Sequence, residues 1–383
     1  MSREGVSEPR PRPASIRDVA RLAGVSHQTV SRVLNGHASI RDVTKSRVLA
    51  AMDELQFRPS RAARMLSTQR SETIGVLAAA VGSHYGPASS VSAVEDAARA
   101  RGYYATVAHL ASVAPGAITA AIEELLSQNV EGIVIVAPRT TVLSRLAALS
   151  MNVPIVAAQG EQSDAGGIPV VSVNQATGVR LVLDYLFGQG HRRILHVAGP
   201  PDWNDAQSRL RAYQAGLRGA GLPASPPLFG DWTADSGYEI GRALVSDTGP
   251  GDLPFTAVFS SNDQMALGLI HAFRAAGLDV PGDVSIVGFD DIPESAHFWP
   301  PLTTVRQDFR ALGMRCVSTL LDAIHLSDDR EAVKSTATAS PLVEPQLVIR
   351  ASVSSVLPAV ATLTAAVSTG WQGLPWRPAA QPP

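Results

Sequence analysis

"SIRDVARLAGVSHQTVSRVLNG", residues 15–36, contains two helical patterns separated by a tight turn. The first pattern has apolar side chains at helical spacing: Ile16, Val19, Ala20 and Ala23. Gly24 then predicts the end of this helix, because glycine readily adopts positive φ, and Ser26 predicts the N-cap of a second helix. The same apolar spacing predicts that the second helix buries Val30, Val33 and Leu34.

The second helix presents polar side chains on its other face: His27, Gln28, Ser31 and Arg32. Gln28 and Arg32 lie one helical turn apart. Two helices joined by a short turn are typical of the helix-turn-helix, whose second helix fits the major groove of DNA. Gln can pair bidentately with adenine and Arg with guanine. The alternative is a small helical hairpin with a solvated polar face.

The charge distribution favours the DNA-binding interpretation. Residues 1–70 hold 13 Lys and Arg against six Asp and Glu, a net charge of +7, whereas the whole chain carries −2. A basic segment on an acidic body indicates a nucleic-acid-binding module attached to a regulatory domain. A third helix, with Thr44 as its N-cap, is predicted from the spacing of Val48, Met52 and Leu55.

Length and composition restrict the class of protein. A chain of 383 residues should form two or three domains, and with 45% hydrophobic residues it can bury a large core. Cys316 is the single cysteine, so intrachain disulfides and Cys-based metal sites are excluded. We find no apolar run typical of a signal peptide or of a membrane span, which needs about 18 apolar residues. A cytoplasmic protein without membrane contact is expected.

From residue 72 onward, short apolar runs alternate with amphipathic helices. The runs are typical of strands buried on both faces and cover residues 72–80, 131–138, 153–160, 169–173, 193–200, 256–263 and 284–291. The predicted helices cover residues 92–102, 118–129, 176–190, 207–221 and 263–277. Strands that alternate with helices predict parallel sheets. There are too many strands for one small sheet, so we expect two subdomains.

Five motifs together resemble the LacI/GalR family of bacterial transcriptional repressors. They are IRDVARLAGVSHQTVSRVLNG, FRPSRAARML, SNDQMALG, VSIVGFDD and PPLTTVRQDFRALG, and the resemblance covers residues 15–350. The downstream motifs are most similar to the lactose repressor branch. The resemblance implies an all-α helix-turn-helix domain and an α/β effector domain like that of periplasmic binding proteins, with three chain crossings near residues 172, 303 and 336. It also implies a homodimer on double-stranded operator DNA.

The resulting domain prediction has five parts. They are a disordered arm (1–14), the helix-turn-helix domain (15–59), a hinge helix and linker (60–71), the sugar-binding and dimerisation domain (72–350) and a disordered tail (351–383). Within 72–350, subdomain 1 is expected at about 72–171 and 303–336, and subdomain 2 at about 172–302 and 337–350. The tail has five prolines, and Pro358 interrupts any heptad pattern, which favours a dimer over a tetramer.

The hinge segment RPSRAARML, residues 58–66, is too short to be a stable helix alone. The resemblance implies that Leu66 enters the central base step and kinks the duplex, with Ala63 allowing close approach. A disordered linker is the alternative. The predicted DNA-binding residues are Ser15, Ser26, His27, Gln28, Ser31, Arg32, Asn35, Ser60, Arg61, Ala63, Arg64 and Leu66.

The effector site is expected beyond the carboxyl ends of the parallel strands. That rule brings together Pro138, Gln159, Asn262 and Asp290. The resemblance adds Pro87, Ser90, Arg211, Trp232, Gln264, Gln307 and Phe309. Sugars need polar side chains for hydrogen bonds and aromatic rings for stacking. Each residue also has a structural alternative: a helix cap for Asn262, a turn cap for Asp290, core packing for Trp232 and Phe309, and a solvated helix for Arg211.

One end of the expected site departs from the lactose repressor branch. Gln159 stands where that branch has Asp, Val136 where it has Asn and Ser112 where it has Arg. These differences argue against a simple galactoside as the ligand.

The favoured function is a repressor that binds a palindromic operator and is released by a small sugar or glycoside inducer. Two alternatives remain open: a ligand that acts as corepressor, and a cytosolic sugar-binding protein without operator specificity. An enzyme is not expected, because HExxH, GxSxG and P-loop motifs are all missing. Neither a cofactor nor a metal is expected.

Overall fold

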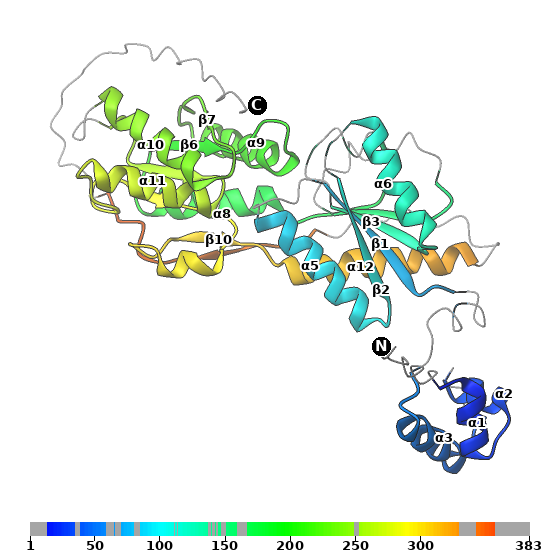
Figure 1. Ribbon diagram of the computed structural model, residues 1–383. Helices are drawn as coiled ribbons and strands as arrows, with labels where there is room; N and C mark the ends of the chain where they lie inside the picture. Colours follow the sequence, from blue (N-terminus) through cyan, green and yellow to red (C-terminus); the bar gives the residue numbers. More distant parts are fainter. Residues whose placement is uncertain are drawn as a thin grey trace, which may run out of the picture. The chain divides into compact units, whose positions relative to one another are not determined.

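The computed structural model describes residues 14–34, 39–58, 65, 70–79, 85–110, 112, 114–136, 139, 142, 145–146, 151–158, 167–248, 253–328 and 342–356. The chain forms two compact units, residues 1–71 and 72–383 (Figure 1). Several predicted functional residues lie outside the described ranges: Asn35, Ser60, Arg61, Ala63, Arg64, Leu66, Pro138 and Gln159.

The described residues of the first unit include the helices α1 (Ile16–Ala23), α2 (His27–Leu34) and α3 (Asp42–Glu54). Their shared core consists of Val19, Ala20, Ala23, Val30, Val33, Val48 and Ala51. Gly24 ends α1 with φ 64°, and the Thr29 amide donates to Ser26 Oγ at 3.1 Å. Both predicted helix boundaries at the turn are therefore confirmed.

The predicted start of the third helix is wrong. Helix α3 begins at Asp42, two residues before Thr44, and follows Arg41, which makes no side-chain cap bond. The carboxylate of Asp42 in the first turn favours this start, because it interacts with the positive end of the helix dipole. The predicted burial of Leu34 is also only partial.

Gly24→Ala should destabilise the helix-turn-helix unit. An L-residue in the left-handed region costs about 1–2 kcal/mol, and a Cβ would lie 2.8 Å from Nη2 of Arg47, which bonds the Ala23 carbonyl. Hydrogen exchange of the core amides should show this loss in the free energy of opening. Gly24→Asn should lose less, because Asn tolerates positive φ. Equal protection in wild type and Gly24→Ala would contradict the expectation.

The second unit contains two parallel sheets. The first has the strand order β2-β1-β3-β4-β5. Its strands are β1 (Thr73–Ala79), β2 (Tyr104–Leu110), β3 (Gly132–Val136), β4 (Ile155–Ala158) and β5 (Val170–Val171). Figure 1 shows α5 (Tyr85–Ala100) and α12 (Phe309–Asp328) on one face of this sheet and α6 (Pro115–Ser127) on the other. Alternate residues of β3 enter the two cores, which explains its continuous apolar sequence.

The second sheet has the strand order β7-β6-β8-β9. Its strands are β6 (Ile194–Ala198), β7 (Leu228–Phe229), β8 (Ala257–Ser260) and β9 (Ser285–Val287). The helices of this subdomain are α8 (Gln175–Gly188), α9 (Asn204–Gly219), α10 (Ala234–Thr248) and α11 (Asp263–Ala275). A short antiparallel pair, β10 (Thr304–Arg306) and β11 (Gln346–Val348), and the 3-10 helix η2 (Pro293–His297) complete it. The predicted fold class is confirmed.

The chain crosses between the two sheets at residues 172–174, 307–308 and 342–345. Two of these crossings are hydrogen-bonded to each other: the Asn174 amide donates to the Val343 carbonyl at 2.8 Å, and the Val343 amide donates to the Ser172 carbonyl at 2.9 Å. These segments therefore run side by side. Residue 336, near which one crossing was expected, lies outside the described ranges.

Residues 351–356 correct the predicted start of a disordered tail. The Thr303 amide donates to Ser352 Oγ at 2.8 Å, the Ser354 amide to Ser285 Oγ at 3.0 Å and the Val356 amide to the Gln189 carbonyl at 2.8 Å. Ser352 is fully buried. The ordered chain thus continues along the second sheet past residue 350, and residues 357–383 lie outside the description.

Candidate DNA-binding surface and effector site

Helix α2 presents the predicted recognition side chains. Gln28 and Arg32 are exposed. Val30, which lies between them in the sequence, and Val33, which follows Arg32, are buried. His27 is also exposed, and Ser31 is half-buried. This arrangement leaves one polar helix face available, as a helix that enters the major groove requires.

Two of the predicted DNA-binding residues have structural roles in the described unit. Ser15 forms a capping box with Asp18: its hydroxyl accepts from the Asp18 amide, and its own amide donates to the Asp18 carboxylate at 2.9 Å. The Ser26 hydroxyl accepts from the Thr29 amide. These oxygens satisfy helix N-termini, so any contact with DNA would compete with capping.

The second unit contains a small cavity, with an accessible volume of about 30 Å³, where its two subdomains meet. The cavity is lined by Tyr85, Gly86, Pro87, Trp203, Asp205, Arg209, Trp232, Asn262, Gln264, Asp290 and Gln307. Asn262 and Asp290 follow β8 and β9, as the strand-end rule predicts.

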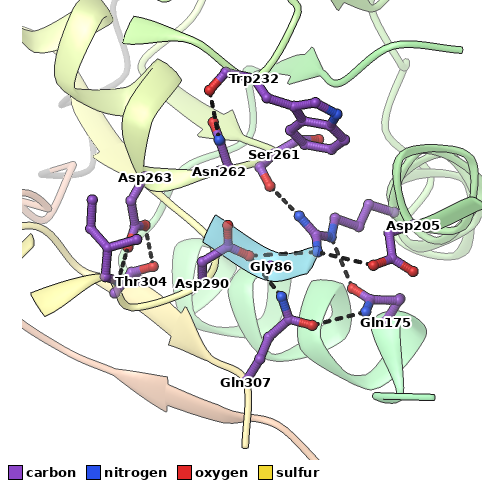
Figure 2. A network of polar contacts seen from close by, with 12 residues as sticks. Gly86, Gln175, Asp205, Trp232, Ser261, Asn262, Asp263, Asp290, Thr304 and Gln307 are labelled. Atoms are coloured by element: carbon purple, nitrogen blue, oxygen red, sulfur yellow. Dashed lines mark hydrogen bonds and ion pairs between the residues drawn. The ribbon is translucent and has the colours of Figure 1, made fainter. Parts of the chain in front are cut away.

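Arg209 is the central cation of the site and is only 3% exposed. Its Nε donates to Gln175 Oε1 at 2.8 Å, and its Nη1 donates to the Ser261 carbonyl. Nη2 lies 3.7 Å from Asp290 Oδ1 and 3.9 Å from Asp205 Oδ2. Figure 2 labels these four partners, Gln175, Ser261, Asp290 and Asp205, within one network of polar contacts. The guanidinium also lies 3.9 Å from the ring centre of Phe289, which fixes its plane.

Arg211, the arginine predicted for this role, does not line the cavity. It is exposed on α9 and donates to Gln207 and Ser208 on the same helix. Two residues along an α-helix rotate a side chain by about 200°, which places Arg211 on the opposite face from Arg209. The register of the buried Ala206, Tyr213 and Leu217 could have identified Arg209, since it lies on their face.

Asp290 is the carboxylate at the other side of the cavity. It is 7% exposed and accepts a bond of 2.7 Å from Gln307 Nε2. Burial raises the pKa of Asp290 to about 6, although the positive charge of Arg209 opposes this shift. The neighbouring Asp291 differs: burial would raise its pKa, but hydrogen bonds from Arg350 and Arg306 lower the pKa overall. Asp291 is therefore held by arginines outside the cavity lining.

Asn262 both caps a helix and lines the cavity. Its Oδ1 accepts from the Met265 amide at 2.9 Å, and its Nδ2 donates to the Trp232 carbonyl at 2.9 Å. The helix-cap alternative is thus correct, and it is compatible with a place in the site. The second bond holds Trp232, whose φ of 77° turns the backbone there.

Two tryptophans form an aromatic wall. The rings of Trp203 and Trp232 meet edge to face with centroids 5.4 Å apart. Trp232 Nε1 is buried without a hydrogen-bond partner, which costs about 1–3 kcal/mol. A ligand oxygen would satisfy this donor. Gly199 allows the close approach, because a Cβ there would lie 2.2 Å from the Trp232 ring.

Two other predicted residues stand behind the cavity rather than in its lining. Ser90 is fully buried and donates to the Gly86 carbonyl at 2.9 Å. Phe309 packs edge-on against Tyr85, with centroids 5.9 Å apart. Pro87, Trp232, Asn262, Gln264, Asp290 and Gln307 do line it. Sequence reasoning missed Tyr85, Gly86, Trp203, Asp205 and Arg209.

The described residues contain no group of three His, Cys, Asp or Glu side chains that could hold a metal ion. Among the helices in the same ranges, none combines the length and the apolar character needed to span a membrane.

A helix-turn-helix joined to a two-subdomain unit with a polar and aromatic cavity defines the class of ligand-responsive DNA-binding regulators. Comparisons with known proteins agree. Residues 15–60 match the model for bacterial regulatory proteins of the lacI family, and residues 183–353 match a periplasmic binding protein-like domain. The chain belongs to the lacI family of bacterial regulatory proteins. It is a DNA-binding transcriptional regulator, not an enzyme.

Individual relatives support this assignment over most of the chain. The lactose operon repressor of Escherichia coli (strain K12) is 35% identical over 81% of this chain and 84% of the relative. The ribose operon repressor of the same organism is 33% identical over 81% and 93%, respectively. The solved lac repressor dimer, bound to operator and the anti-inducer ONPF, has a TM-score of 0.76 and 32% identity, covering 90% of this chain and 100% of that chain.

Proposed function

We propose that the protein is a repressor that binds a palindromic operator as a homodimer and releases it when a small sugar or glycoside enters the cavity. The observation that carries the proposal is the cavity where Arg209, Asp290 and two tryptophans meet. The related lac repressor structure is a dimer on operator DNA, and a related regulator, CelR, has been solved with cellobiose (TM-score 0.63, 28% identity, covering 88% of this chain and 99% of that chain). Such a regulator acts in the cytoplasm, at the nucleoid.

The chemistry of the lining suits a sugar. A carboxylate accepts bonds from two neighbouring hydroxyls, a guanidinium donates in a fixed fork, and an indole face covers the C–H surface of the ring. Asp290, Arg209 and Trp232 provide these three groups around one cavity.

A gel shift tests the proposal. The full chain is mixed with DNA that flanks its own gene, and D-galactose, D-ribose, lactose and cellobiose are added separately. Release of the complex by one sugar is the expected result. Tighter binding in the presence of a sugar would identify that sugar as a corepressor instead. Failure to select any flanking DNA over random DNA would favour a sugar-binding protein without operator specificity.

Effector binding should weaken as the pH falls below about 6. Protonation of Asp290, whose pKa is about 6, removes an acceptor for sugar hydroxyls. The same raised pKa means that the folded state binds this proton more tightly than the unfolded state, so protonating Asp290 stabilises the fold as pH falls. Weaker effector binding at low pH would therefore not arise from a loss of fold stability caused by Asp290. Calorimetry between about pH 7 and about pH 5 should show the change, and Asp290→Asn should show a flat profile.

A further inference from the structure

Two buried amides connect the central cation of the site to its carboxylate. Arg209 Nε donates to Gln175 Oε1 at 2.8 Å, Gln175 Nε2 donates to Gln307 Oε1 at 3.0 Å, and Gln307 Nε2 donates to Asp290 Oδ1 at 2.7 Å. Each of the four side chains is more than nine-tenths buried. Figure 2 shows Gln175, Gln307 and Asp290 along this path. We call these four residues the amide bridge.

The two ends of the amide bridge fix the orientation of both amides. Arginine offers only donors and an ionised carboxylate only acceptors, so each glutamine must accept on the Arg209 side and donate on the Asp290 side. A carboxamide is suited to both tasks. Glutamate at position 175 would still accept from Arg209 but would face Gln307 Oε1 with a second oxygen. Both positions therefore require an amide for the complete chain of bonds.

Both glutamines lie where the chain passes between the subdomains. Gln175 is the first residue of α8 and directly follows the crossing segment 172–174. Gln307 lies between β10 and α12, in the crossing segment 307–308. Gln307 lines the cavity, whereas Gln175 does not. Gln175 thus contacts Arg209 from behind the site and joins two crossings that are 132 residues apart.

We propose that Gln175 is a positioning residue, which holds the Arg209 guanidinium at the cavity and links it through Gln307 to two crossing segments. A ligand that moves Arg209 or Asp290 then moves the crossings as well, because the bonds of the amide bridge are continuous. The inference rests on the proposed function for the identity of the ligand as a sugar. The amide bridge itself can be tested without any ligand.

The ligand-free test is a double-variant cycle on thermal unfolding of the full chain. Gln175→Met and Gln307→Met should each lower the Tm, because each leaves a buried partner unsatisfied. The double variant should lose less than the sum of the two losses. Gln175→Met combined with Arg180→Gln, an exposed residue of α8 that pairs with Asp184, should be additive. Additive losses for positions 175 and 307 would overturn the amide bridge.

The positioning role is tested by comparing sugar affinity with operator affinity. Calorimetry with D-galactose, D-ribose, lactose and cellobiose measures the sugar Kd of wild type, Gln175→Glu and Gln175→Met. Both variants should weaken the binding of the sugar that wild type accepts by about tenfold, and operator affinity without sugar should stay within about twofold. Equal sugar affinity in all three proteins, or a parallel loss of operator affinity, would refute positioning. Binding of none of the sugars by wild type would instead count against the proposed ligand class, and the thermal cycle would still decide the amide bridge.

Discussion

Arg209→Ala should strongly weaken the response to effector while leaving operator binding in place. The substitution removes the guanidinium that lies 3.7 Å from Asp290 and 3.9 Å from Asp205, along with its hydrogen bonds to a ligand. Charge-assisted bonds of this kind contribute about 1.5–3 kcal/mol each, so the effector concentration for release should rise at least about tenfold. A gel shift with increasing sugar, with and without the substitution, measures this change.

Arg211→Ala is the matched control for that experiment. It removes an arginine from the same helix two residues away, but the side chain is exposed and donates to Gln207 and Ser208 of its own helix. Its effector response should equal that of wild type. Removing one partner of a buried ion pair costs about 3–5 kcal/mol of stability, and Arg209→Ala bears this cost. Arg209→Lys keeps the positive charge and therefore serves as a second variant. A defective Arg211→Ala beside a normal Arg209→Ala would show that the site is assigned to the wrong arginine.

Gln28→Ala and Arg32→Ala should each weaken specific operator binding by about 1–3 kcal/mol, the value of one good bidentate contact with a base. Non-specific DNA affinity should change much less, because it depends on contacts with phosphates. Both side chains are exposed on α2, so neither substitution removes a buried contact. Competition gel shifts with operator and random DNA give the two affinities.

Arg21→Ala is a suitable control for the recognition helix. Arg21 is an exposed arginine on α1 that pairs with Asp18, so it carries the same charge from a different helix. Its removal should affect operator and random DNA to a similar, small extent. If Gln28→Ala and Arg32→Ala also lowered the two affinities equally, their side chains would contact phosphates rather than bases.

Local signals in the sequence were sufficient for the helix-turn-helix. Gly24 needs positive φ and Ser26 caps α2, and both requirements act within a few residues of the turn. The buried strands were equally clear, because β3 and β6 are covered on both faces and read as continuous apolar runs. Strand β2 was missed because it lies at the sheet edge and most of its residues are only half-buried or exposed, so it has no continuous apolar run.

The candidate site depended on information that local patterns do not contain. Choosing between Arg209 and Arg211 requires the register of α9 against the second sheet, and a shift of two residues reverses the face. The bond between Gln175 and Gln307 joins positions far apart in the chain, so only the tertiary fold reveals it. Asp290 was found because the end of a parallel strand is a recurrent ligand position.

The ordered segment 351–356 also determines where the chain can safely be shortened. Removing residues from position 351 onward would take away Ser352. Its carbonyl accepts from the Ile286 amide in β9, and its hydroxyl donates to the Ile286 carbonyl and accepts from the Thr303 amide, so these backbone groups would lose their partners. It would also remove the Ser354 carbonyl, which bonds the buried His191. A truncation therefore has to keep residues up to Val356 if these bonds of the second subdomain are to be retained.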